Sequence, residues 1–368
     1  MSVPLVLTLG EPAGIGPDIT LMAWHRRTEL ALPAFYVLAD PDFLARRARS
    51  LGLEVPITAA TPGTAGAAFA ETLPVVPIGV TVTAEPGQPD RTSAPAALAA
   101  IRLAVADVLA GRATGIVTNP VAKAVLYRTG FAEPGHTEYL AKLAAEATGR
   151  PSRSVMMLWA PELAVVPVTI HLPLREVPGT LTTALVADTA RIVARDLVQR
   201  FGIARPRLAI AGLNPHAGEE GAMGDEDITI VAPAVAELRR EGLRVDGPLP
   251  ADTMFHAAAR SAYDVALCMY HDQALIPIKT LAFDHAVNVT LGLPFVRTSP
   301  DHGTAFDIAG MRIEPGDGEA RPRDPEALHE IARHDACGVR HQCGRERARH
   351  LAQRQMDGHR DDRKLWRP

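Results

Sequence analysis

Short runs of β-branched residues alternate along this chain with longer amphipathic stretches, from the N-terminus to about residue 310. This alternation is typical of an α/β fold built on mainly parallel strands, because each crossover between parallel strands needs a long connection, usually a helix. The apolar runs therefore predict strands, and the amphipathic stretches predict helices. The expected strands span 3–9, 35–39, 114–118, 163–170, 207–213, 264–270 and 286–290, and the clearest helices span 94–110, 137–148, 181–201 and 226–241.

The 368 residues exceed what one hydrophobic core usually serves, so we expect two domains with a cleft between them. The stretch at 58–67, rich in Ala, Thr, Gly and Pro, is expected to be a surface loop. A formal net charge of −4 gives no reason to expect a nucleic-acid partner, and no apolar run approaches the roughly 20 residues that span a membrane. Three cysteines provide no disulfide framework, which favours a cytoplasmic location.

Three of the predicted strands run into a histidine, at His171, His216 and His271. The carboxyl ends of parallel strands meet along one edge of a sheet, so these side chains are candidates for a common site. One such histidine is more often structural, but three at equivalent strand ends favour a metal site. Three imidazoles suit zinc or cobalt and leave a coordination position for a substrate. Asp272, directly after His271, is an orienting residue, a base or a plain surface carboxylate.

A second group of residues is suited to an anion. Lys279, Asn288 and Arg297 follow the third histidine closely, and an arginine can donate two parallel hydrogen bonds to a phosphate or carboxylate. Their alternative interpretation is an ordinary surface charge pair. His136 and Thr137 open a predicted helix, whose free N–H groups favour an anion, although Thr137 is equally suited to a simple N-cap.

The loop at 10–18 contains three glycines but matches neither of the standard nucleotide-binding patterns. Pro17 explains much of this loop as the start of a helix.

Five motifs occur in order along the chain: Gly-Glu-Pro-Ala-Gly-Ile-Gly-Pro-Asp at 10–18, Thr-Asn-Pro-Val-Ala-Lys at 118–123, Gly-His-Thr-Glu at 135–138, Leu-Asn-Pro-His-Ala-Gly-Glu at 213–219 and Tyr-His-Asp-Gln at 270–273. Together they resemble the 4-hydroxythreonine-4-phosphate dehydrogenase family of pyridoxal phosphate biosynthesis. The resemblance covers roughly residues 3–310. It implies a subunit of two α/β/α domains with a central cleft, similar to isocitrate and isopropylmalate dehydrogenases rather than to Rossmann dehydrogenases. It also implies a homodimer whose active site is completed across the subunit interface.

The resemblance assigns roles to residues by motif position. It implies a first domain of residues 1–125 plus about 298–310, which carries the cofactor loop, and a second domain of residues 126–297, which carries the metal and substrate residues and the dimer contacts. The implied metal ligands are His171, His216 and His271, and the implied substrate contacts are His136, Thr137, Lys279, Asn288 and Arg297.

The segment 302–310 resembles the adenosine-binding loop of the isopropylmalate dehydrogenase group. His302, Gly303 and Asp307 are its implied cofactor contacts. An acidic residue at the position of Asp307 goes with NAD, because a carboxylate accepts hydrogen bonds from ribose hydroxyls and repels the added phosphate of NADP. NAD is therefore expected, with NADP as the alternative, and a simple glycine-containing turn is the plainer interpretation.

The implied reaction is the NAD-dependent oxidation of 4-phosphooxy-L-threonine to a β-keto acid, which decarboxylates to 3-amino-2-oxopropyl phosphate. One divalent ion, zinc, magnesium or cobalt, would lower the pKa of the substrate hydroxyl. Asp272, Asp252 and Lys279 are the catalytic candidates, and the choice of proton acceptor between Asp272 and Asp252 stays open. The alternatives are a dehydrogenase of phosphorylated threonate or erythronate and, from another class, a zinc hydrolase.

The segment 311–368 differs in character from the rest, with 12 arginines, five histidines and little amphipathic periodicity. We expect it to be poorly ordered, and the spacing of Cys337, His341 and Cys343 fits no standard zinc pattern. It departs from the family pattern, either as a divergent tail or as the product of a reading-frame shift. The second origin raises a further alternative, a folded but inactive protein.

Overall fold

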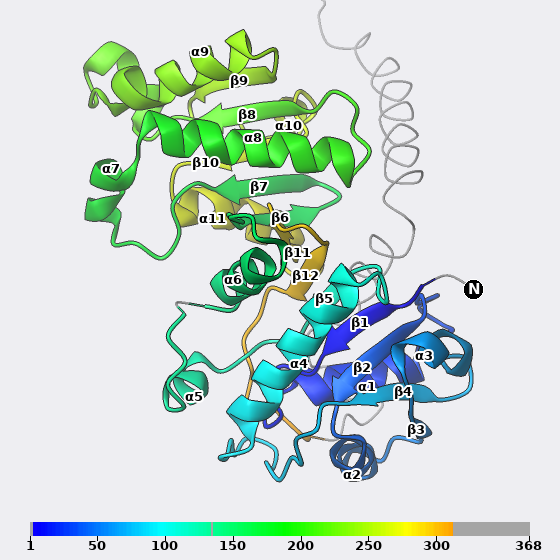
Figure 1. Cartoon of the computed structure of the whole chain (residues 1–368). Coiled ribbons are helices and arrows are strands. Elements are labelled where there is room, and N and C mark those ends of the chain that lie inside the picture. The colour runs from blue at the N-terminus through cyan, green and yellow to red at the C-terminus, as the bar shows by residue number, and fades with distance from the viewer. Residues whose placement is uncertain (1–2, 134, 312–368) are drawn as a thin grey trace, which may run out of the picture.

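A computed structural model describes residues 3–133 and 135–311 of the chain. One sheet of 12 strands runs through it, in the order β3-β4-β2-β1-β5-β12-β11-β6-β7-β10-β8-β9 (Figure 1). The strands are β1 (Leu5–Thr8), β2 (Phe35–Ala39), β3 (Ile57–Ala59), β4 (Leu73–Pro77), β5 (Ile116–Thr118), β6 (Val155–Ala160), β7 (Leu163–Pro167), β8 (Arg207–Ala211), β9 (Arg244–Leu249), β10 (Val265–Cys268), β11 (Val287–Leu291) and β12 (Arg297–Pro300).

The helices lie in the connections between these strands. They are α1 (Gly16–His25), α2 (Pro41–Leu51), α3 (Pro62–Ala68), α4 (Ser93–Leu109), α5 (Lys123–Tyr127), α6 (His136–Thr148), α7 (Val177–Thr180), α8 (Thr183–Gln199), α9 (Ala232–Arg240), α10 (Ala257–Arg260) and α11 (His271–Ala282). Among the described residues, no helix combines the length and the apolar character that crossing a bilayer requires.

Both ends of the sheet are parallel, and its middle is antiparallel. Strands β1 to β5 pair in parallel with one another and with β12, and β7 to β10 form a second parallel block. Between them, β12, β11, β6 and β7 are joined by three antiparallel pairings. The expectation of mainly parallel strands is therefore right for both blocks, and the antiparallel centre was not predicted.

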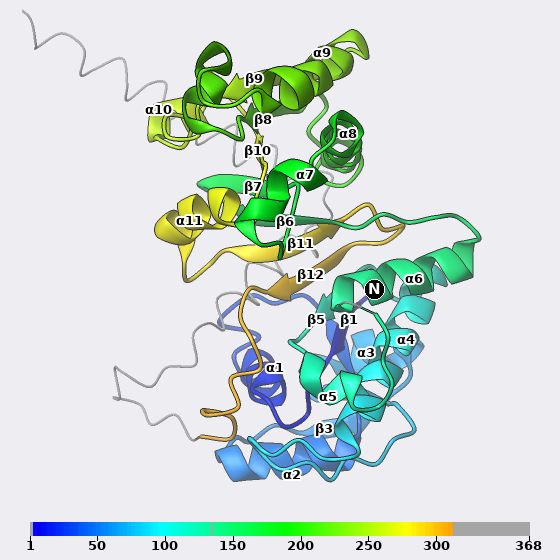
Figure 2. The ribbon, with the colours of Figure 1, turned by 90° about the vertical axis from the view of Figure 1, so that its left-hand side faces the viewer.

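Helices cover both faces of the sheet. Alternate residues of β1 and β10 enter different apolar clusters, since Leu7 and Leu267 face one side while Val6 and Ala266 face the other. Helices α1, α2, α8 and α9 pack on the first face, and α4, α6 and α11 pack on the opposite one. Figure 2 shows α8 and α9 across the sheet from α11. The predicted α/β/α layering is confirmed, and the strand order differs from that of a Rossmann sheet.

All seven predicted strands are present, and the four clearest helices appear close to their predicted limits. The helix expected at 226–241 begins as a wider π-type turn at Asp227–Val231 before α9. The surface loop expected at 58–67 is wrong, because this stretch forms the end of β3 and most of α3. Pro62 suits the first turn of α3, and the Thr64 hydroxyl accepts a hydrogen bond from the Thr61 N–H at 3.1 Å, which starts the helix.

The domain limits at 125 and 297 stay a prediction, because a single sheet crosses both of them. The expectations for 311–368, including those for Cys337, His341 and Cys343, lie outside the described residues apart from Met311.

Candidate active site

The three histidines follow three neighbouring parallel strands. Strand β10 lies between β7 and β8 in the sheet, and all three point the same way. His171 follows β7, His216 follows β8, and His271 is the first residue of α11, directly after β10. The chain thus delivers all three imidazoles to the same edge of the sheet, as the strand-end pattern predicts.

His171 and His271 form a pair, with ring centroids 5.7 Å apart and ring planes inclined by 40°. Burial lowers the pKa of His171, and the electrostatic effects of the nearby Lys123 and His271 lower it further against the opposing effect of Glu138. The His171 imidazole is therefore neutral at pH 7, which is the form that binds metal ions. The Asp272 carboxylate lies 2.7 Å from Nδ1 of His271 and fixes that ring, which leaves Nε2 for a ligand.

His216 lies on an unusual loop. Its φ is +53°, and Ala217, Glu219 and Glu220 are also left-handed. The buried Asp227 carboxylate holds this loop by accepting hydrogen bonds from the Leu213 and Asn214 N–H groups at 2.7 and 3.0 Å. The His216 side chain is exposed. Within the described part of the chain, no three His, Cys, Asp or Glu side chains gather closely enough to hold a metal ion, so one copy does not unite His216 with the other two.

The predicted anion-binding residues include a buried cation without a counter-ion. Arg297, only 4% exposed, donates hydrogen bonds to the Thr118 hydroxyl at 2.7 and 3.0 Å and to the Thr290 hydroxyl at 2.9 Å. Among the described residues no carboxylate lies within ion-pair distance of it. Burial lowers the pKa of Arg297 to about 10, with Glu138 acting in the opposite direction, so the guanidinium is charged at pH 7.

His136 and Asn288 contribute further polar atoms that have no partner. The His136 Nε2 atom is buried and has no hydrogen-bond partner among the described residues, and the same holds for the Asn288 side-chain oxygen. Burial, together with the Arg297 cation, holds the pKa of His136 well below its usual value, so the ring is neutral. Because buried polar atoms without partners are rare, these atoms indicate a place for a polar ligand.

The other predicted residues have different surroundings. Thr137 lies in the first turn of α6, whose N-cap residue Gly135 offers no side-chain cap. Lys279 is held by Asp301 at 2.9 Å. Asp252 is exposed on the turn after β9, and no described contact joins it to the histidines.

Two residues of the site, Lys123 and Glu138, were not predicted. The Lys123 Nζ lies 3.4 Å, and a Glu138 carboxylate oxygen 2.7 Å, from the point where a Cβ on Gly135 would lie. Both side chains thus lie beside the start of α6, and both act electrostatically on His171. They end two of the motifs quoted above, at 118–123 and 135–138, and those motifs were the signal that could have identified them.

The predicted cofactor segment packs on the glycine-containing loop at 10–18. Ile15 N–H donates to the Thr304 carbonyl at 2.9 Å, and Gly310 N–H donates to Asp18, which forms a buried ion pair with Arg47 at 2.6 Å. A Cβ on Gly14 would lie 2.8 Å from the Thr304 oxygen, so close approach of the two loops explains this glycine.

Of the predicted cofactor contacts, His302, Gly303 and Asp307 are exposed on this segment. These three residues are therefore accessible to a ligand.

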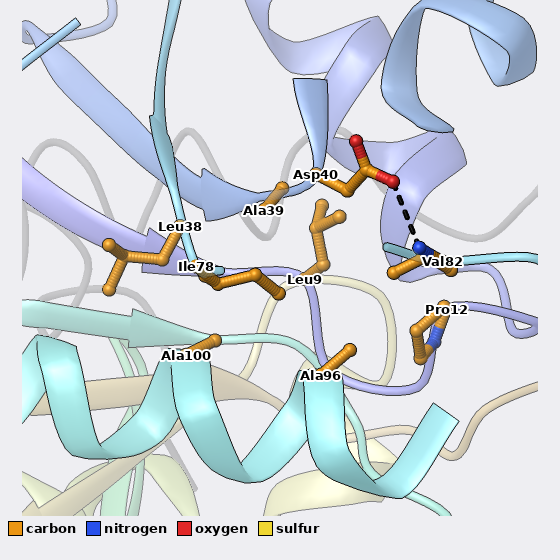
Figure 3. A pocket seen from close by; sticks show the side chains of 10 residues that line it. Leu9, Pro12, Leu38, Ala39, Asp40, Ile78, Val82, Ala96 and Ala100 are labelled. Atoms are coloured by element: carbon orange, nitrogen blue, oxygen red, sulfur yellow. Dashed lines mark hydrogen bonds between the residues drawn. The ribbon is translucent and has the colours of Figure 1, made fainter. Parts of the chain in front are cut away.

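A small pocket lies apart from these residues, at the carboxyl ends of β1, β2 and β4 (Figure 3). It encloses about 220 Å³, including space open to solvent, and its walls are mostly aliphatic. Its one ionisable group, Asp40, already accepts a hydrogen bond from the Val82 N–H at 2.9 Å. The pocket therefore brings no reactive group to the candidate site.

The sequence profile described as "Pyridoxal phosphate biosynthetic protein PdxA" matches residues 31–316. A curated 4-hydroxythreonine-4-phosphate dehydrogenase of Bradyrhizobium diazoefficiens is 63% identical over 337 residues, which cover 89% of this chain and 96% of that protein. The enzyme of the same name from Xanthobacter autotrophicus is 59% identical, with 90% and 93% covered.

Solved structures of similar proteins share the fold of this chain. The crystal structure of 4-hydroxythreonine-4-phosphate dehydrogenase from Klebsiella pneumoniae aligns with a TM-score of 0.76 at 34% identity, covering 92% of this chain and all of that one. A terephthalate 1,2-cis-dihydrodioldehydrogenase from Burkholderia xenovorans aligns with a TM-score of 0.61 at 26% identity, over 92% and 99% of the two chains. The profile match and the high identity to curated relatives show that this chain belongs to the PdxA family of pyridoxal phosphate biosynthetic proteins.

Proposed function

We propose that this chain is an NAD-dependent dehydrogenase that oxidises 4-hydroxythreonine 4-phosphate, the substrate in the name of its curated relatives. The observation that supports this most strongly is Arg297, a buried guanidinium whose described partners are only hydroxyl groups. Such a cation is stable in the interior when an anion joins it. It lies near His136 at the start of α6, where free backbone N–H groups also favour a phosphate.

The proposed metal site consists of His171 and His271 of one copy and His216 of a second copy. The donor chemistry fits, because neutral imidazoles suit zinc and related ions, and Asp272 orients His271. A divalent ion held there would make the substrate hydroxyl more acidic and so prepare its carbon for oxidation. The second copy is needed because the described part of one chain provides no group of three ligands.

A homodimer also agrees with the distribution of exposed apolar side chains. Exposed apolar residues follow each of the three histidines closely in the sequence: Leu172 and Leu174, Met223, and Ile276. Exposed apolar side chains clustered beside a site are typical of a protein interface. We therefore propose that the dimer forms along this edge of the sheet and completes both active sites.

The chain's own residues have separate tasks in the reaction. Arg297 and the start of α6 bind the phosphate, and a neutral His136 can donate one hydrogen bond to a phosphate oxygen. Asp272 orients His271, while Asp252 remains the candidate for accepting the hydroxyl proton. His302, Gly303 and Asp307 would bind NAD, which accepts the hydride when bound. The unpaired buried thiol of Cys268 agrees with a reducing, cytoplasmic location.

An assay with several substrates tests this function. Purified protein with zinc, magnesium or cobalt is mixed with NAD or NADP and with 4-hydroxythreonine 4-phosphate, phosphorylated threonate, phosphorylated erythronate or unphosphorylated 4-hydroxythreonine. We expect NADH formation with the first substrate and little with the unphosphorylated one. Faster NADH formation with phosphorylated erythronate or threonate would reassign the substrate, and absence of NAD binding would favour the hydrolase alternative.

A further inference from the structure

Lys123 lies close to the start of α6 and acts electrostatically on His171 of the histidine pair. It is the first residue of α5, and its Nζ lies 3.4 Å from the point where a Cβ on Gly135 would be placed. Gly135 is the N-cap of α6 and has an extended backbone with no side-chain cap. The Lys123 ammonium group therefore lies beside the free N–H groups that begin this 13-residue helix.

The charged and titratable groups near Lys123 belong to the histidine pair and to the proposed phosphate site. Its charge acts on His171, one member of the histidine pair. Glu138, whose carboxylate also lies beside Gly135, acts on both His171 and Arg297. Lys123 is exposed, and among the described residues it takes part in no ion pair within 4.0 Å. Its ammonium group is thus available to a ligand.

The charge balance at the start of α6 identifies the kind of ligand. Glu138, which lies beyond ion-pair distance, partly opposes the positive charge of Arg297, and the helix end contributes about half a positive charge. A phosphate monoester carries about −1.5 to −2 charges at pH 7, so these groups alone leave it undercompensated. Lys123, a second unpaired cation beside the same helix end, would compensate the remaining negative charge of the phosphate. Arg297 is buried and Lys123 is exposed, so a phosphate bound at the start of α6 would meet the two cations from different sides.

We infer that Lys123 binds the substrate's phosphate group together with Arg297 and the start of α6, and that it thereby selects phosphorylated substrates. This inference rests on the proposed function. The alternative is a role at the histidine pair. There, Lys123 would act on the reacting hydroxyl, and its loss would change the rate of oxidation rather than the binding of phosphate.

The test uses Lys123→Met, which keeps the aliphatic stem and removes the charge, and Lys123→Arg, which keeps the charge. Lys142→Met is the matched control, because Lys142 also belongs to this region but pairs with Glu133 on the exposed side of α6. Inorganic phosphate is the probe, measured by calorimetry and as an inhibitor competing with the substrate. We expect Lys123→Met to weaken phosphate binding and to raise KM by about tenfold or more, because the variant loses a charged hydrogen-bond donor to the phosphate.

The same experiment predicts nearly unchanged kcat for Lys123→Met, partial rescue in Lys123→Arg and wild-type values for Lys142→Met. Unchanged phosphate affinity in Lys123→Met, or a wild type that does not bind phosphate, would overturn the inference. So would a lower kcat with a shifted pH profile at unchanged phosphate affinity, which would assign Lys123 to the histidine pair. If the wild type binds phosphate through Lys123 but does not oxidise 4-hydroxythreonine 4-phosphate, the proposed function fails and the inference stands.

Discussion

At the scale of single residues, two groups of the candidate site, Arg297 and His136, lie in buried surroundings that disfavour their charged forms. Arg297 remains charged although it is buried and contacts only threonine hydroxyls, and His136 is held neutral beside it. A buried, unpaired cation destabilises a folded chain. The phosphate ligand proposed above would supply the negative charge that the surrounding residues lack.

The neutral state of His136 predicts a dependence of stability on pH. Below the ordinary histidine pKa of about 6.5, the unfolded chain takes up a proton at His136 that the folded chain excludes, so the free energy of unfolding decreases as the pH falls. The loss is complete once the pH passes the lowered pKa of the folded state. In His136→Gln this contribution is absent. Urea unfolding of ligand-free protein at about pH 7 and about pH 5 should therefore show a smaller loss for the variant. Equal losses would indicate that the His136 pKa is not lowered.

The sequence identified some residues of the site better than others. The three histidines could be predicted because strand ends are visible as apolar runs. His136 lies in one of the family motifs, and Arg297 was predicted as an anion-binding cation that closely follows the third histidine. Lys123 and Glu138 were not singled out, because their proximity depends on how α5 and α6 pack around Gly135. That His171 and His271 form a pair without His216 also depends on three-dimensional geometry, since the three strand ends look equivalent in the sequence.

At the scale of elements, the loop that carries His216 is held in an unfavourable conformation. Four of its non-glycine residues, at 216, 217, 219 and 220, have positive φ angles, and a left-handed conformation costs roughly 1–2 kcal/mol for each such residue. Asp227 opposes this cost, because its carboxylate accepts two backbone hydrogen bonds at the base of the loop.

Asp227→Ala should therefore destabilise the protein and, at the same time, make the loop that carries His216 less ordered. Hydrogen bonds to a charged acceptor contribute about 1.5–3 kcal/mol each, so loss of both should lower the free energy of unfolding by roughly 3–6 kcal/mol. Zinc affinity, measured by calorimetry, should fall as well. The exposed Asp225→Ala is the control and should change stability by no more than about 0.5 kcal/mol. Wild-type stability and zinc affinity in Asp227→Ala would show that the carboxylate does not hold the loop.

The elements themselves could be predicted where one signal dominates. Buried parallel strands such as β7 and β10 are continuous apolar runs, and glycine marks the ends of α6 and several other helices. Strands β3 and β12 are short and polar in part, so no apolar run distinguishes them. The antiparallel centre depends on the pairing of β6 with β11, which are far apart in the sequence, and periodicity carries no information on such pairing.

At the scale of the whole molecule, one sheet connects the residues proposed for the phosphate, the metal ion and the cofactor. Strand β12 carries Arg297 and leads directly to the segment at 302–310, which the buried Asp18–Arg47 pair ties to the first strands. The histidines lie at the ends of the second parallel block. One copy brings His171 and His271 together but does not bring His216 to them, and this is why a second copy is part of the proposal.

Mixed dimers test this proposal most directly. Chains carrying His216→Ala and His271→Ala are co-expressed with different tags, and dimers that contain one chain of each kind are isolated. In such a dimer, one site keeps His171 and His271 from the first chain and His216 from the second. We predict that each variant alone binds no metal and forms no NADH from 4-hydroxythreonine 4-phosphate, and that the mixed dimer regains a clear fraction of wild-type activity. A folded mixed dimer that remains inactive, or single variants that keep full activity, would contradict the shared three-histidine site.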